Sequence, residues 1–192
     1  MHTIIFATNN EHKIKEIQSL VGSDFTIITL EQAGIDIDIP EPHDTLQENA
    51  YEKAITIENM TQQNCFSEDT GLEIEALNGE PGVKSARYAG ENRNFQANID
   101  KVLQKLKGNI NRKAQFRTVI CLLWNKEVFY FEGICKGHIA ETMHGKEGFG
   151  YDPIFIPEGA SKSFAEMTME EKNKFSHRQK AVTQLFTFLH SI

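Results

Sequence analysis

The apolar positions of this chain follow two patterns, short continuous runs and repeats at every third or fourth residue. Continuous runs bounded by polar residues predict buried strands, and the longer spacing predicts amphipathic helices. The predicted strands cover residues 3–8, 25–30, 65–67, 114–124 and 127–135, and the predicted helices cover residues 10–21, 46–62, 95–107 and 168–189. Strands and helices alternate through much of the chain, which indicates an α/β fold.

Turn-forming and capping residues refine this pattern. Asn125 and Lys126 separate the last two strands and predict a hairpin, so the sheet should be mixed rather than purely parallel. Thr45 and Glu48 match a capping box at the start of the second helix. The strand that begins at Cys65 is expected to be short and to run into the acidic stretch that follows it.

Length and charge limit the function. The chain has 192 residues, of which 40% are hydrophobic, enough for one domain with a buried core. We therefore treat residues 1–192 as a single domain. The formal net charge of −7 argues against nucleic-acid polymers and anionic membranes as partners. A small nucleotide is not excluded, because it needs only a local basic pocket or a bound metal ion.

The chain carries no signal for secretion or membrane insertion. Residues 1–6 lack a basic segment, and no apolar stretch is long enough to span a bilayer. We therefore expect a soluble, cytoplasmic protein. Cys65 and Cys121 stand in apolar surroundings, so we expect buried, inert thiols rather than metal ligands.

The first candidate site is the stretch from Thr8 to Lys13, where a strand ends and a helix begins. Free backbone N–H groups and the helix dipole favour an anion at such a point, and Lys13 adds a positive charge. The alternative is an Asn-capped surface helix with a solvated lysine. The stretch is not a Walker A loop, because it has no glycines and no Gly-Lys-Ser/Thr.

The second candidate site is the pair Glu68 and Asp69, which follows an apolar strand and precedes Gly71. Magnesium prefers one or two carboxylates together with phosphate oxygens and waters. A carboxylate beside the metal can also accept a proton from an attacking water. The alternative is a solvated acidic turn. Glu41, in a proline-flanked loop, could join the pair, whereas Glu48 has a structural alternative in the capping box.

The third candidate site is the glycine-rich stretch around Phe149. Gly148 and Gly150 would let the backbone approach a ligand closely while the ring stacks on a base, and Asp152 is held extended by Pro153. The alternative is a tight turn with two core aromatic residues. The glycines do not have the spacing of a dinucleotide-binding loop.

The fourth candidate site combines Lys172 with His177 and Arg178. In one straight helix Lys172 and His177 would not share a face, so both reach one pocket only if the helix breaks near Ser176. His177 and Arg178 offer donors for a purine carbonyl or a phosphate. The alternative is a solvated basic helix face. Together, the four stretches fit a nucleoside triphosphate with magnesium.

Four stretches of the sequence, in order, match those of one known family. They are IFATNNEHKIKEI at 5–17, SEDTGLEIEALNGEPGVKSARYAG at 67–90, GFGYDPIF at 148–155 and FAEMTMEEKNKFSHRQKA at 164–181. On these residues the chain resembles the inosine triphosphatase family of non-canonical purine nucleotide pyrophosphatases, also called the Ham1 or RdgB family.

The resemblance implies an elongated, two-lobed α/β domain around a mixed, mostly parallel sheet, assembled as a homodimer. It implies an enzyme that hydrolyses dITP, ITP and XTP to the monophosphate and pyrophosphate. A magnesium-activated water would attack the α-phosphorus, and the reaction would remove deaminated purines from the nucleotide pool. A Maf-type pyrophosphatase for modified pyrimidine nucleotides and a non-catalytic nucleotide-binding module are the alternatives.

The resemblance also implies a role for individual residues. Asp69 would accept the proton of the attacking water, and Glu41, Glu68 and Asp69 would form the metal site. The substrate-binding positions would be Thr8, Asn9, Asn10, Glu11, His12, Lys13, Thr70, Phe149, Gly150, Tyr151, Asp152, Lys172, His177 and Arg178. Asn9 and Lys84 depart from the family pattern, in which many members have glycine and an aromatic residue. Asn9 should keep the turn, because asparagine tolerates positive φ.

Overall fold

The computed structural model describes residues 2–20 and 25–192. It confirms an α/β fold with a mixed sheet. The chain divides into two compact units. Unit 1 consists of Met1–Asp69, Thr118–Gly133 and Arg178–Ile192, and unit 2 consists of Thr70–Arg117 and Ile134–His177.

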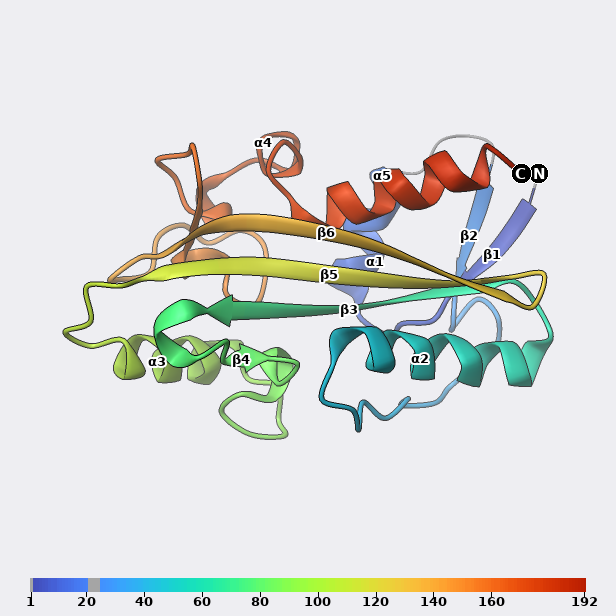
Figure 1. Cartoon of the computed structure of the whole chain (residues 1–192), viewed down its shortest axis with the longest axis horizontal. Helices are drawn as coiled ribbons and strands as arrows, with labels where there is room; N and C mark the ends of the chain where they lie inside the picture. Colours follow the sequence, from blue (N-terminus) through green and yellow to red (C-terminus); the bar gives the residue numbers. More distant parts are fainter. Residues whose placement is uncertain (1, 21–24) are drawn as a thin grey trace. The chain divides into compact units, whose positions relative to one another are not determined.

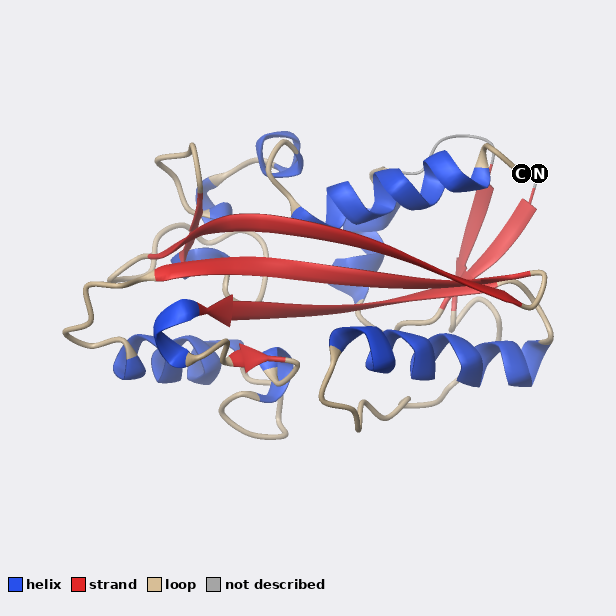
Figure 2. Cartoon of the chain, in the orientation of Figure 1, coloured by secondary structure: helices blue, strands red, loops and turns tan. Residues whose placement is uncertain are grey.

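Strands and helices alternate along the chain, as Figures 1 and 2 show. The strands are β1 (His2–Phe6), β2 (Phe25–Thr29), β3 (Cys65–Ile74), β4 (Pro81–Gly82), β5 (Lys113–Trp124), β6 (Glu127–Ile139) and β7 (Phe155–Pro157). The helices are α1 (Glu11–Gln18), α2 (Leu46–Thr61), α3 (Phe95–Lys105), α4 (Met169–Asn173) and α5 (His177–Leu189). Short 3-10 turns occupy Glu75–Leu77, Ser85–Arg87, Asp152–Ile154 and Phe164–Glu166.

The sheet has the strand order β2-β1-β3-β5-β6-β7, and β4 pairs with β3 off this path. Strand β1 pairs in parallel with both β2 and β3. Strand β4 runs antiparallel to β3, and β7 runs antiparallel to β6. The predicted hairpin is confirmed, since Asn125 and Lys126 have positive φ angles of 50° and 68° between β5 and β6.

Unit 1 has a separate apolar core on each face of its strands. Ile4 and Phe6 of β1 belong to a cluster that includes residues of α1 and α5. Ile5 and Ala7 belong to another cluster, which includes Ala50, Ala54 and Ile57 of α2. Successive side chains of a strand point to opposite faces, so a continuous apolar run is needed to fill both cores. Figure 1 shows α2 and α5 on opposite sides of the unit 1 strands.

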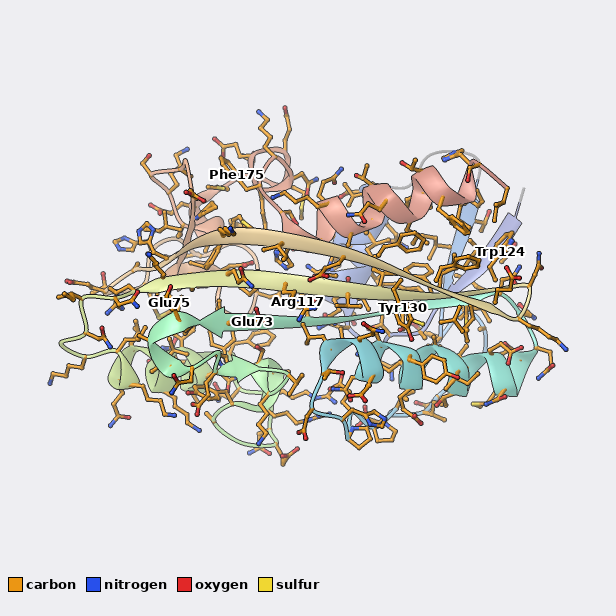
Figure 3. The ribbon with its side chains drawn as sticks, viewed as in Figure 1. Glu73, Glu75, Arg117, Trp124, Tyr130 and Phe175 are labelled. Atoms are coloured by element: carbon orange, nitrogen blue, oxygen red, sulfur yellow. The ribbon has the colours of Figure 1, made fainter. Side chains whose placement is uncertain are left out.

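Unit 2 has one apolar face and one polar face. Leu72 and Ile74 of β3 pack in the core with residues of α3 and β5. Glu73, between them, faces the other way and lies 3.8 Å from Nη1 of Arg117; both are labelled in Figure 3. This polar face carries a pocket of about 700 Å³ lined by residues from several segments, among them Glu73, Glu75, Lys113, Lys136 and His138. None of the predicted site residues lines that pocket.

The predicted boundaries differ most from the structure in two places. Strand β3 does not end before the acidic pair but continues to Ile74, because it pairs with β5 as well as with β4. The prediction of a single last helix over residues 168–189 is wrong, because the segment forms two helices, α4 and α5. The break near Ser176 that the fourth candidate site requires is therefore present. Val21, at the end of the first predicted helix, lies outside the described residues.

The structure also confirms the predicted helix cap at Thr45 and the predicted burial of two cysteines. Thr45 caps α2 by accepting a hydrogen bond from the backbone N–H of Glu48 at 3.1 Å, while the Glu48 carboxylate accepts from the Thr45 hydroxyl. Cys65 and Cys121 are buried, and burial raises the pKa of both thiols to about 12. Among the described helices, none has the length and apolar character to cross a membrane.

Candidate functional site

Strand β3 sends the two adjacent carboxylates to opposite faces, because side chains alternate along a strand. Asp69 shares its face with Ser67, whose hydroxyl donates to the carbonyl of Ala50 in α2. Glu68 shares its face with Phe66, which packs in the cluster of α1 and α5. The two carboxylates therefore enter two different charged clusters of unit 1.

The first cluster joins Lys53, Glu41 and Asp69. The Lys53 ammonium donates to Oε1 of Glu41 and to Oδ1 of Asp69, both at 2.8 Å. Lys53 comes from α2 and is only 7% exposed. Burial alone would lower its pKa, but the negative charges of Asp69 and Glu41 raise that pKa above the ordinary value. The lysine is therefore a permanent cation between the two carboxylates.

The loop that carries Glu41 is fastened to the rest of unit 1. The side chain of Asn49, in α2, accepts from the backbone N–H of His43 at 2.9 Å and donates to the carbonyl of His43 at 3.0 Å. The amide of Asn9 donates to the carbonyl of Ile37 at 2.7 Å. Glu41 is thus held by its chain neighbours as well as by Lys53.

One carboxylate oxygen of Asp69 lacks a hydrogen-bond partner among the described residues. This oxygen, Oδ2, is buried. Burial raises the pKa of Asp69 above the ordinary value, although Lys53 and Lys13 oppose that effect. A buried carboxylate oxygen without a partner is costly, and a cation or a proton donor at Oδ2 would remove that cost.

The residues present fit a magnesium site that is completed by a substrate. Within the described residues, no three His, Cys, Asp or Glu side chains gather as a ready-made metal site. Magnesium commonly takes only one or two carboxylates and draws its remaining ligands from phosphates and waters. Glu41 and Asp69 could supply those carboxylates.

The second cluster joins Glu68, Arg178, Lys13 and Glu16. Arg178, at the start of α5, donates from Nε and Nη2 to the Glu68 carboxylate at 2.8 to 3.0 Å and from Nη1 to Glu16. Lys13 lies 3.2 Å from Oε1 of Glu68. Burial would raise the pKa of Glu68, but Arg178 and Lys13 lower it to about 2. The resemblance implies that Glu68 assists at the metal; in the structure its carboxylate pairs with Arg178 and Lys13.

The two clusters together hold four carboxylates and three cations. The carboxylates are Glu16, Glu41, Glu68 and Asp69, and the cations are Lys13, Lys53 and Arg178. With all of them ionised, the negative charges exceed the positive ones by one. A polyphosphate that approaches these residues therefore needs further positive charge, and a divalent cation supplies it.

The start of α1 is already capped. The side chain of Asn10 accepts hydrogen bonds from the backbone N–H groups of His12 and Lys13 at 3.0 and 3.3 Å. The hydroxyl of Thr8 accepts from the backbone N–H of Asn10 at 3.2 Å. Glu11 and His12 are exposed. An anion here would meet Lys13 and the helix dipole rather than a row of free N–H groups.

The glycine-rich loop of unit 2 is organised by Asp152. The backbone N–H of Phe149 donates to Oδ2 of Asp152 at 2.9 Å, and the Lys172 ammonium donates to the same oxygen at 2.7 Å. Gly148 has a φ of 75°, and a Cβ there would fall 2.1 Å from this oxygen. Glycine is therefore required for the loop to close on Asp152.

The remaining unit 2 residues surround this pair. The Lys172 ammonium lies 5.4 Å from the centre of the Phe149 ring and 5.3 Å from that of Phe164. His177 stacks on Phe116 with the ring centres 4.7 Å apart. The hydroxyl of Tyr151 donates to the carbonyl of Ser85 at 2.8 Å, so this ring packs in the core.

The structure divides the predicted residues between the two units. Unit 1 holds Thr8, Asn9, Asn10, Glu11, His12, Lys13, Glu41, Glu68, Asp69 and Arg178, and unit 2 holds Thr70, Phe149, Gly150, Tyr151, Asp152, Lys172 and His177. The turn at Asn9 does not have a positive φ, so it does not need glycine. Lys84 is exposed and precedes a short 3-10 turn.

Sequence reasoning missed Lys53, Asn49, Glu16 and Phe116. A signal was available for Lys53, which falls on the apolar face of α2 beside Ala50 and Ala54. A charged residue there must find buried partners. Glu16 follows Lys13 by three residues and could have been read as its helix neighbour, but only the fold brings Arg178 to it.

Comparison with known proteins finds related sequences over nearly the whole chain. A family model described as the Ham1 family matches residues 4–188. The dITP/XTP pyrophosphatase of Flavobacterium johnsoniae is 50% identical over 186 residues, 97% of each chain. That of Porphyromonas gingivalis is 50% identical over 190 residues, 98% of each chain.

Solved structures show the same fold. The Ham1 protein of Staphylococcus aureus is similar with a TM-score of 0.89 and 39% identity, covering 98% of both chains. A HAM1 protein from Coxiella burnetii is similar with a TM-score of 0.91 and 37% identity over the full length of both chains. With the family model matching nearly the whole chain, this protein belongs to the Ham1 family.

Proposed function

We propose that this chain hydrolyses the non-canonical purine nucleoside triphosphates dITP, ITP and XTP to the monophosphate and pyrophosphate, with magnesium as cofactor. Its relatives named dITP/XTP pyrophosphatase match it over nearly the whole chain. The observation that carries the mechanism is the buried Oδ2 of Asp69, which has no hydrogen-bond partner among the described residues.

Asp69 is the proton acceptor in this proposal. Lys53 fixes Oδ1 at 2.8 Å, so Oδ2 is left to accept the proton of the water that attacks the α-phosphorus, with pyrophosphate as the leaving group. Burial raises the pKa of Asp69, which makes it a stronger base than a solvated carboxylate. Magnesium, held by Asp69 and Glu41, would neutralise phosphate charge and lower the pKa of the attacking water.

Lys13 is the phosphate-binding cation. It lies in the first turn of α1, and its side chain is 14% exposed while Glu68 is fully buried beneath it. Glu68, bound on its other side by Arg178, therefore acts as a support for Lys13 rather than as a metal ligand. In this role Arg178 connects α5 to β3 and orients the carboxylate that holds Lys13.

The unit 2 residues are proposed to bind the base. The Phe149 ring offers a stacking surface, and Lys172 and His177 offer donors. Hypoxanthine and xanthine carry a carbonyl acceptor at position 6, where adenine carries an amino group. A donor left without a partner against adenine would support strong discrimination.

We also propose where this reaction takes place and how the enzyme assembles. The enzyme would act in the cytoplasm on free nucleotides and remove deaminated purines before polymerases use them. It would work as a homodimer, which light scattering at micromolar concentration tests directly.

Product analysis tests the reaction. The purified protein is incubated with dITP, XTP, dATP and dGTP, with and without magnesium, and pyrophosphate is separated from phosphate. We expect pyrophosphate from dITP and XTP only, dependent on magnesium and lost in Asp69→Asn. Release of inorganic phosphate would place the attack at the γ-phosphorus and contradict the mechanism. Binding without turnover would favour the nucleotide-binding module.

A further inference from the structure

Lys53 lies where a cation shared by Glu41 and Asp69 would lie. Its ammonium is 2.8 Å from one oxygen of each carboxylate. The three side chains come from three segments, the loop before α2, α2 itself and β3. The Lys53 side chain is 8% exposed, so little solvent competes for it.

A tethered ammonium changes what the two carboxylates can bind. With Lys53 in place, Glu41, Asp69 and Lys53 together carry one net negative charge. A divalent cation bound by both carboxylates would either lie beside this buried ammonium, which repels it, or displace the ammonium from its two ionic hydrogen bonds. Leaving a buried charge without its partners is strongly unfavourable.

Phosphate oxygens alter this balance. A triphosphate contributes several negative charges and the oxygen ligands that magnesium prefers. It can also pair with an ammonium that gives up a carboxylate, because ammonium groups bind phosphate well. Within the described residues no third acidic, histidine or cysteine side chain completes a metal site. Without a nucleotide, these residues therefore supply a divalent cation with few ligands.

We propose that Lys53 is a built-in counter-ion that keeps the Glu41–Asp69 pair from holding a divalent cation until a nucleotide is bound. The inference rests on the proposed function, since it assigns the metal to the same two carboxylates. Under it, the enzyme takes up metal and nucleotide together and carries no resident metal between turnovers.

The test measures binding of Mn²⁺, a spectroscopic substitute for magnesium, to nucleotide-free protein by electron paramagnetic resonance and calorimetry. We expect Lys53→Met to bind Mn²⁺ at least about tenfold more tightly than the parent protein, because the buried carboxylate of Asp69 and the half-buried one of Glu41 then lack a counter-charge. Lys53→Arg keeps the cation and should resemble the parent. Lys107→Met, an exposed lysine of unit 2, is the matched control and should also resemble the parent.

A second variant keeps the test decisive if Lys53→Met does not fold. Lys53→Gln keeps a hydrogen-bond donor near both carboxylates and should show the same gain in Mn²⁺ affinity if Lys53→Met does not fold. In either variant, adding Asp69→Asn should abolish the gain. Addition of a non-hydrolysable α,β-methylene analogue of dITP should produce tight Mn²⁺ binding in the parent.

Two results would overturn the inference. One is equal nucleotide-free Mn²⁺ affinity in the parent and in folded Lys53→Met or Lys53→Gln. The other is tight nucleotide-free binding by the parent that Asp69→Asn removes. None of these measurements uses turnover, so absence of dITP hydrolysis would refute the proposed function while the nucleotide-free comparison still decides the role of Lys53.

Discussion

The guanidinium of Arg178 and the carboxylate of Glu68 form a bidentate salt bridge, with Nε 2.8 Å from Oε2 and Nη2 2.9 Å from Oε1. Both side chains are buried. The pair ties the first turn of α5 to the middle of β3. It therefore connects two segments that are 110 residues apart in the sequence.

The stability of the protein should depend on pH through Glu68. Arg178 and Lys13 lower the folded-state pKa of Glu68 from 4.5 to about 2. A carboxylate with a depressed pKa stabilises the fold fully above its unfolded pKa, and this contribution is lost as the pH falls from 4.5 through 2. The shift corresponds to roughly 3 kcal/mol.

Glu68→Gln isolates this contribution. We expect the variant to lose free energy of unfolding at pH 7 and to differ much less from the parent at pH 3, as measured by urea denaturation. Glu127→Gln, at an exposed carboxylate, should match the parent at both pH values. A loss of the same size at pH 7 and pH 3 would contradict the role of the ionised carboxylate.

Asp69→Asn should abolish most of the activity while keeping the fold. Asparagine retains an oxygen that can accept from Lys53 but cannot take up a proton from water. Removal of a general base lowers kcat by about 10² to 10⁴-fold. Steady-state kinetics with dITP checks this, and circular dichroism checks the fold. A kcat within a factor of about three of the parent's, which is less than 1 kcal/mol in the barrier, would exclude Asp69 as the base.

Phe149→Ala should weaken substrate binding more than turnover. Base stacking on an aromatic side chain is worth ~1–3 kcal/mol, so we expect KM for dITP to rise by roughly tenfold to hundredfold. The Phe149 ring is half-buried and its backbone is held by Asp152, so the loop should persist. Phe149→Tyr keeps the ring and should remain close to the parent. An unchanged KM in the alanine variant would show that the ring does not contact the base.

Substitution by alanine should cost different amounts of stability at two glycines of the same loop. Gly148 and Gly150 both have positive φ, but only at Gly148 would a Cβ meet an obstacle, Oδ2 of Asp152 at 2.1 Å. Both variants bear the backbone strain, roughly 1–2 kcal/mol. Gly148→Ala should lose at least about 2 kcal/mol more, because it displaces Asp152 from the buried Lys172. Equal losses in urea denaturation would show that the loop can shift around the new methyl group.

The sequence determined most of the elements, because local hydrophobic spacing and capping residues act over a few neighbours. The buried strand β1, the Thr45 cap of α2 and the turn at Asn125–Lys126 followed from such patterns. The length of β3 did not follow, since it depends on pairing with β5 and β4.

The charged clusters were decided by the tertiary structure alone. The sequence places Glu68 beside Asp69, but the strand turns them to opposite faces, where Arg178 meets one and Lys53 the other. Ion pairs between distant segments do not depend on the spacing of neighbouring residues, so they leave no periodic signal in the sequence. The sequence therefore determined which chemical groups are present, and the fold decided which charges are paired and which oxygen of Asp69 is left for chemistry.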